Sequence, residues 1–207
     1  MNLSKIIALS SLVCFLQSSA LAANTEWKID PLHTKASFTV KHMMISNVRG
    51  EFAKVSGTAH YDGQSLANSN VSAVIDASSV NTNEPQRDQH LKSPDFFDAA
   101  KYPTITFKSK KVETDADGFK IVGDLTMHGI TKTITLTAEP LPPPIKDPMG
   151  FLRTGTEAKT KINRKDFGVA FDKVMDNGGA LVGDDVDIAI EVELIQKPAT
   201  AGNNSTL

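Results

Sequence analysis

The sequence has few of the residues that hold small domains together through covalent links or large aromatic cores. Its 207 residues include one cysteine and one tryptophan, and aromatic residues make up 6 % of the chain. Cys14 lies in an apolar N-terminal run that we expect to be removed, which excludes disulfide bonds from the mature chain. Stability must therefore come from burial of aliphatic side chains, and a chain of this length can form a full core.

An excess of charge of one sign is also lacking. The 22 Lys and Arg residues nearly balance the 24 Asp and Glu residues, so the formal net charge is −2. Nucleic-acid binding needs a basic face, and we expect no nucleic-acid partner. The five histidines lack the short spacings typical of zinc sites, and the mature chain has neither a Gly-x-Ser-x-Gly elbow nor a nucleophilic cysteine. We therefore predict no metal site, no cofactor and no catalytic residues.

The N-terminus has the pattern of a cleavable export signal. Lys5 precedes an apolar run at 6–16 that is too short to span a bilayer, and Ala20-Leu21-Ala22 supplies small residues for cleavage. We predict a signal peptide over residues 1–22, a barrel domain over 23–197 and a flexible tail over 198–207. The protein is then expected in the periplasm, with no transmembrane segment after cleavage.

Alternation with period two dominates the rest of the chain, which indicates β-strands with one apolar and one polar face. Short turns join most of them, so the sheet is antiparallel. Strands of this kind must hide one face, either against a second sheet or by closing into a barrel, and closure also removes the edges. We predict an all-β, eight-stranded antiparallel barrel with a short helical insertion. The strong strands are 36–42, 55–61, 71–76, 104–107, 119–125, 130–137, 156–162 and 186–194, with a weaker one at 27–30.

Many inward positions of these strands carry small residues, among them Ala36, Ala73 and Ala158. Such residues indicate an underfilled barrel with an apolar tunnel, but small residues opposite large ones would also fill an ordinary core. Both readings stay open at this point. His42 is a polar anchor in the first reading and a hydrogen-bonded core histidine in the second. The residues expected to line a tunnel are Phe38, Val40, His42, Ala59, Ile75, Phe107, Ile121 and Leu136.

The insertion between strands 71–76 and 104–107 is a candidate lid. Ser93-Pro94 predicts the start of a short helix that runs to Phe97 or Ala99, and Phe96 and Phe97 would pack the lid onto the barrel. The polar residues Arg87, Asp88 and His90 lie within four positions, so one helical turn could present them together. They are expected to tie the lid to the rim through charge-assisted hydrogen bonds or to contact a ligand head group, and an Asp–His catalytic dyad is the alternative.

An ordered set of motifs runs over residues 26–196. The motifs are Trp27-x-Ile29-Asp30-x-x-His33, Phe38-x-Val40-x-His42, Val48-x-Gly50-x-Phe52, Arg87-Asp88-x-His90-Leu91-x-Ser93 with Phe96-Phe97, Tyr102-Pro103-x-Ile105-x-Phe107-x-Ser109, Gly123-Asp124-Leu125-Thr126-x-x-Gly129, Arg164-x-Asp166-Phe167-Gly168 and Val182-Gly183-Asp184-x-Val186. This set resembles the YceI-like family of lipid- or polyisoprenoid-binding proteins. The resemblance implies a lipocalin-like, eight-stranded antiparallel barrel with an elongated apolar cavity for an isoprenoid or other long-chain amphiphile. It also agrees with a periplasmic location.

Three functions follow from these observations. The first is a periplasmic carrier or store that holds an isoprenoid lipid or a quinone, and it is the one we favour; the protein is then not an enzyme. The second is an enzyme that uses Asp88 and His90 on a hydrophobic small molecule. The third is a stress-related structural protein with a filled barrel. The oligomeric state is not determined by the sequence, and a homodimer is left open.

Overall fold

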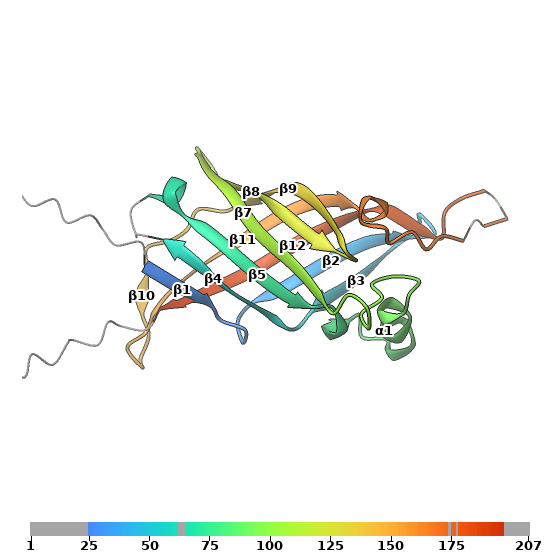
Figure 1. Ribbon diagram of the computed structural model, residues 1–207, viewed down its shortest axis with the longest axis horizontal. Coiled ribbons are helices and arrows are strands. Elements are labelled where there is room, and N and C mark those ends of the chain that lie inside the picture. The colour runs from blue at the N-terminus through green and yellow to red at the C-terminus, as the bar shows by residue number, and fades with distance from the viewer. Residues whose placement is uncertain (1–24, 62–64, 174, 177, 197–207) are drawn as a thin grey trace, which may run out of the picture.

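The computed structural model describes residues 25–61, 65–173, 175–176 and 178–196, and most of them lie in one antiparallel sheet (Figure 1). The predicted signal peptide and C-terminal tail lie outside these residues and stay predictions. Among the described residues, no helix is long and apolar enough to span a membrane. The strands are β1 Thr25–Ile29, β2 Lys35–His42, β3 Ser46–Phe52, β4 Val55–Tyr61, β5 Asn70–Asp76, β6 Val80–Asn81, β7 Thr104–Asp115, β8 Gly118–Met127, β9 Ile130–Ala138, β10 Ile145–Lys146, β11 Leu152–Asn163 and β12 Val182–Gln196; the helices are α1 Pro85–Lys92 and the short 3₁₀ turns η1 Leu66–Asn68, η2 Ala77–Ser79 and η3 Arg164–Phe167.

These twelve segments form eight barrel strands, because several of the strands are interrupted. β1 and β2 together form the first barrel strand, and both pair with β12. β3 and β4 form the second, in which β3 pairs with β2 and β4 pairs with β1. β5 and β6 form the third, in which β5 pairs with β4 and β6 pairs with β3. β9 and β10 likewise both pair with β11. The barrel strands are then arranged in the order of the chain. β12 closes the barrel by pairing with β1 and β2 on one side and with β11 on the other. The predicted eight-stranded antiparallel barrel is confirmed.

The first three interruptions lie side by side in the barrel wall. Residues 53–54 separate β3 from β4, and η2 separates β5 from β6. Hydrogen bonds join these two breaks, from the Lys54 amide to Ser79 Oγ at 3.2 Å and from the Asp76 amide to the Lys54 carbonyl at 3.0 Å. The break at 30–34 is flanked by the pairs Lys28–Thr58 and Ala36–Phe52, so it lies beside 53–54. We call this line of breaks the crease.

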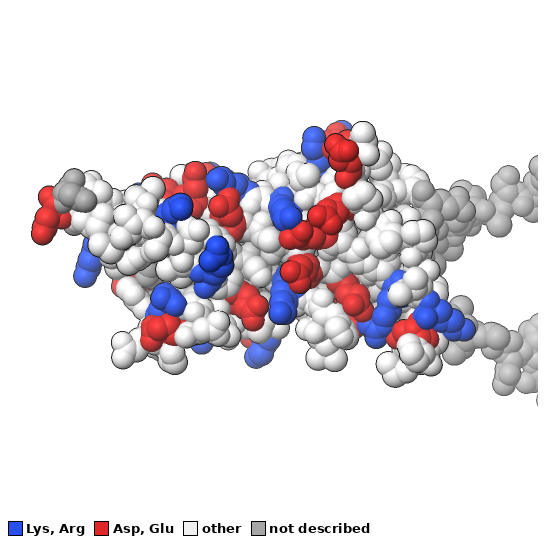
Figure 2. Space-filling view, turned by 180° about the vertical axis from the view of Figure 1, so that it is seen from behind, with Lys and Arg blue, Asp and Glu red and all other residues white. Residues whose placement is uncertain are grey.

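The inward faces of the strands form the core, as period-two alternation requires. One cluster of buried residues includes Trp27, Phe52, Ile105 and Phe167, and a smaller cluster gathers around Phe119 near the β7–β8 turn. On the face shown in Figure 2, Lys and Arg are interspersed with Asp and Glu. This face thus shows no patch of one charge sign, in keeping with the balanced charge of the sequence.

The helical turn predicted at Arg87–His90 is confirmed, but the short helix predicted from Ser93-Pro94 is wrong. The helix begins earlier, at Pro85, because the Glu84 carboxylate accepts hydrogen bonds from the Gln86 and Arg87 amides and caps it. Ser93 ends the helix, since its amide and its hydroxyl both donate to the His90 carbonyl. Both sites combine a capping residue with a following proline, so the sequence alone does not distinguish them. The strand Ser46–Phe52 was also not predicted.

Candidate functional site

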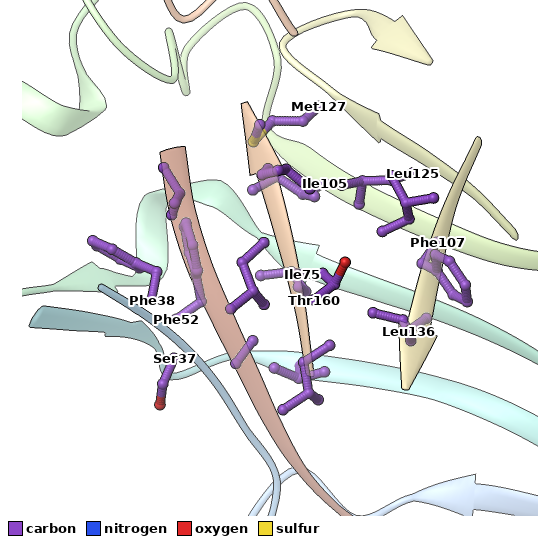
Figure 3. A pocket seen from close by; sticks show the side chains of 18 of the residues that line it. Ser37, Phe38, Phe52, Ile75, Ile105, Phe107, Leu125, Met127, Leu136 and Thr160 are labelled. Atoms are coloured by element: carbon purple, nitrogen blue, oxygen red, sulfur yellow. The ribbon is translucent and has the colours of Figure 1, made fainter. Parts of the chain in front are cut away.

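The barrel encloses an apolar cavity of about 210 Å³ (Figure 3). On the same scale a cavity of about 150 Å³ holds one benzene molecule, so this cavity has room for roughly eight carbon atoms of a chain. The wall consists of the inward faces of the strands, of three lid residues and of residues outside the strands such as Arg164 and Val169. Residues on the wall include Ile29, Ala36, Phe52, Val71, Ala73, Leu91, Phe96, Phe97, Ile105, Leu125, Met127, Ile134, Ala158, Ile162, Ile188 and Ile190. The barrel is thus underfilled, as the small inward residues had suggested.

Six of the eight predicted lining residues lie on this wall, and contact with a ligand stays a prediction for all of them. The six are Phe38, Val40, Ile75, Phe107, Ile121 and Leu136. Ala59 and His42 are not among the lining residues. Ala59 is buried in the core opposite its cross-strand neighbour Trp27. His42 lies at the end of β2, paired with Ser46 and Val182.

The polar side chains of the insertion form hydrogen bonds with one another and with the residues just before the insertion. The Thr82 amide and hydroxyl donate to Asp88 Oδ1 at 2.8 and 2.6 Å, and Arg87 Nε donates to Thr82 Oγ1 at 2.8 Å. His90 Nε2 lies 2.8 Å from Asp95 Oδ2. Asp88 and His90 thus take different partners, and the geometry favours a structural role over a catalytic dyad.

The insertion meets the barrel through aromatic rings. We call residues 83–102 the lid. Its Phe97 ring lies 5.3 Å from that of Phe52, and its Phe96 ring lies 4.8 Å from that of Phe171. His90 packs edge-on against both Phe96 and Phe171, at 5.0 Å from each. Phe171 was not singled out in the sequence, where it stands in a loop without strand alternation.

Arg164 supports the frame on which the lid rests. Its side chain is buried, and Nε donates to the Gly183 carbonyl at 2.9 Å. Nη1 donates to the carbonyls of Val169 and Phe171 at 2.7 and 2.8 Å, and Nη2 donates to Val182 and to Asp184 Oδ1, both at 3.1 Å. These five bonds use every guanidinium donor and fix the loop that carries Phe171. The sequence placed Arg164 in a family motif but did not reveal this role.

Arg153 holds the opposite end of the barrel. Its guanidinium donates to Asp30 Oδ2 and Asp147 Oδ2, both at 2.7 Å, and it also pairs with Glu193. Each aspartate starts an Asp-Pro turn in which Oδ1 accepts the amide two residues later, from Leu32 at 3.0 Å and from Met149 at 2.9 Å. One arginine thus ties two loops to β11 and β12. We call this group the Arg153 clamp.

The clamp shifts the pKa values of its members. Burial by itself raises the pKa of Asp30, but hydrogen bonds from His33, Arg153 and the Leu32 amide outweigh it and lower that pKa to about 2. The hydrogen bond from Arg153 also lowers the pKa of Asp147, and the three carboxylates raise the pKa of Arg153. Asp30, His33 and Glu193 have suitable ligand atoms for a metal ion within 4.8 Å of one another. The Arg153 guanidinium already donates hydrogen bonds to both carboxylates, so the geometry fits an ion-pair network better than a cation site.

Known proteins resemble both the sequence and the fold. Residues 27–194 match the family model of the YceI-like domain. A YceI protein from Escherichia coli is 39 % identical over 183 residues, which cover 88 % of this chain and 92 % of that protein. A crystal structure of a YceI protein from Campylobacter jejuni has a TM-score of 0.64 at 36 % identity and covers 76 % of this chain and 90 % of its own.

A polyisoprenoid binding domain from Saccharophagus degradans has the same fold, with a TM-score of 0.59 at 17 % identity over 83 % of this chain and 98 % of that domain. This likeness concerns the fold alone. The family model and the Escherichia coli relative concern the sequence, over nearly the whole of the described region. The chain belongs to the YceI-like family.

Proposed function

We propose that the protein binds the chain of an isoprenoid lipid inside the barrel and carries or stores it in the periplasm. The observation that carries this proposal is the apolar cavity with a lid at one end. Membership in the YceI-like family and the fold shared with a polyisoprenoid binding domain support the ligand class. A quinone with a prenyl tail fits the same cavity.

The size of the cavity supports a chain ligand on energetic grounds. Each buried methylene contributes about 0.8 kcal/mol, so a chain segment of roughly eight carbons gains on the order of 6 kcal/mol. Association costs roughly 4–15 kcal/mol in lost freedom, which leaves binding favourable only when the segment fills the cavity along its whole length. Arg164 lies on the wall but donates all its N–H groups to protein oxygens. The head group is therefore expected at the rim, near the lid.

The lid supplies a route into the cavity. Among the described residues, every hydrogen bond of the lid that involves a side chain lies within the lid or joins it to Asn81 or Thr82, the two residues just before it. Asn83 at its start has a φ of 59°, a left-handed conformation in which strain is stored, and Pro103 follows its end. A segment that is bonded internally and meets the barrel through rings can swing out as one body. The lipid chain would enter beneath it.

The test is uptake of prenyl lipids by the delipidated protein, together with mass spectrometry of lipids extracted from protein purified out of its native periplasm. Ala73→Phe places a ring in the cavity and is expected to abolish uptake, whereas Ser72→Phe, on the outer face of the same strand, is expected to leave it unchanged. Repeated recovery of empty protein that takes up no added prenyl lipid would overturn the proposal. Equal uptake by the two variants would place the lipid outside the barrel.

A further inference from the structure

Two phenylalanines of the cavity wall lie against glycines of the neighbouring strands. Phe38 on β2 is the cross-strand partner of Gly50 on β3, and Phe107 on β7 lies beside Gly123 on β8. A Cβ atom added to Gly50 would meet the Phe38 ring, with Cε1 at 2.8 Å, and one added to Gly123 would meet the Phe107 ring, with Cε2 at 2.7 Å. Each ring thus occupies the space that a side chain at the glycine would need.

The glycines let both rings lie back against the wall. Figure 3 shows Phe38 and Phe107 on opposite sides of the cavity, each with its ring directed away from the middle, and Ile75 and Thr160 between them. Gly50 stands two residues before the buried Phe52 on β3, and Gly123 stands two residues before the buried Leu125 on β8. Because residues two apart on a strand face the same side, both glycines occupy inward positions. A side chain there would displace the ring, and an inward ring that cannot lie on the wall can only turn into the lumen.

We propose that Gly50 and Gly123 set the width of the cavity and thereby select a methyl-branched isoprenoid chain over a straight acyl chain of the same length. This inference rests on the proposed function, because it concerns the chain held in the same cavity. A polyprenyl chain carries a methyl branch on every isoprene unit and is wider than a straight chain. The space left by the two withdrawn rings accommodates those branches, and each methyl group that finds room strengthens binding about fourfold.

Gly50 is the better position for the test. A Cβ at Gly50 would meet only side-chain atoms, namely the Phe38 ring and Thr82 Cγ2 at 2.7 Å. At Gly123 it would also lie 2.6 Å from the Lys108 carbonyl oxygen, which belongs to the backbone and cannot move aside. Gly50→Ala therefore narrows the cavity at lower cost to the fold. The double variant Gly50→Ala/Phe38→Ala keeps the contact with Thr82 but removes the ring, so it isolates the effect of ring displacement.

The experiment is competition binding of geranylgeraniol against hexadecanol, the straight-chain alcohol with the same main-chain length and no methyl branches. We expect the unaltered protein to prefer the branched alcohol by on the order of tenfold, Gly50→Ala to lose this preference, and the double variant to regain it. Circular dichroism and the urea midpoint verify folding. Should Gly50→Ala not fold, Phe38→Trp, which keeps the glycine but enlarges the ring, narrows the cavity in a second way.

Two results would overturn the inference alone: binding of both alcohols without preference by the unaltered protein, or an unchanged preference in a folded narrowed variant. Failure of the double variant to regain the preference would also overturn it, because ring displacement would then not be the cause. Binding of neither alcohol by the unaltered protein would instead overturn the proposed function, and this inference with it.

Discussion

The two ends of the barrel are held by different forces. At the end that contains β1 and β10, the Arg153 clamp binds two loops through charged hydrogen bonds. At the end that contains α1, the lid meets the barrel through ring contacts around Phe171 and Phe52. Ring contacts have no strict hydrogen-bond geometry to satisfy, so they can separate without leaving charged groups unpaired. We therefore expect the lid end to open more easily than the clamp end.

The largest effect is expected beneath the lid, at Arg164. Replacement by Met removes the donor from four backbone carbonyls and leaves Asp184 with Lys165 alone, so the free energy of unfolding should fall by roughly 3–5 kcal/mol. Urea denaturation measures this change. Lys165→Met removes a neighbouring exposed cation and is the control, for which we expect a small effect. Equal losses for the two variants would contradict the view that the opening end rests on a rigid frame.

The next effect concerns the Arg153 clamp and its dependence on pH. The pKa of Asp30 is about 2 in the folded protein, below its ordinary value of 3.8, so its contribution to stability is present above about pH 4 and is lost as the pH falls towards 2. Arg153→Met should lower the urea midpoint at pH 7, and its difference from the unaltered protein should shrink between pH 4 and 2. A difference that is constant over this range would show that the clamp does not act through its carboxylates.

A smaller effect is expected for the lid contacts. Phe171→Ala removes the ring that packs against both Phe96 and His90, and each such pair contributes roughly 0.5–1.5 kcal/mol. Release of a fluorescent prenyl probe should accelerate by roughly 2- to 13-fold per ring pair, as stopped-flow mixing would record. Phe151→Ala, next to the clamp, should leave the release rate unchanged. Faster release from this control would mean that the lipid leaves through the clamp end.

The smallest effect is expected at Trp27. Its indole Nε1 is buried without a hydrogen-bond partner, the only such side-chain atom within the part of the chain that the structure describes. Trp27→Phe loses apolar contact but removes a donor whose burial costs about 1–3 kcal/mol, so the free energy of unfolding should change by less than about 1 kcal/mol. A much larger loss on urea denaturation would indicate that a buried water satisfies the indole.

Local alternation made most of the fold predictable. A strand with one buried face shows its inward residues directly, which is why six of the eight predicted lining residues lie on the cavity wall. β3 was missed although Val48, Gly50 and Phe52 alternate with polar residues, because the glycine weakens the apolar pattern. The helix was misplaced because Glu84-Pro85 and Ser93-Pro94 both have the form of a helix start.

The contacts that hold the two ends of the barrel could not be predicted from local sequence patterns. Asp30 and Arg153 are 123 residues apart in the sequence, and the five acceptors of Arg164 include four backbone carbonyls, which carry no residue-specific signal. The space between Phe38 and Gly50 likewise depends on the register of two strands. Such features depend on the assembled barrel and cannot be read from residue types alone.

The crease has a consequence for local unfolding. It divides three neighbouring barrel strands into two panels. One panel consists of β2, β3 and β6 and lies on the side of α1, and the other consists of β1, β4 and β5. The strands β11 and β12 continue past the crease without interruption. Regions with interrupted ladders tend to open as separate cooperative units. Amide hydrogen exchange in the panel next to the lid should therefore proceed in one step of its own, ahead of the rest of the wall, so that the mouth of the barrel loosens while β11 and β12 keep the cylinder intact.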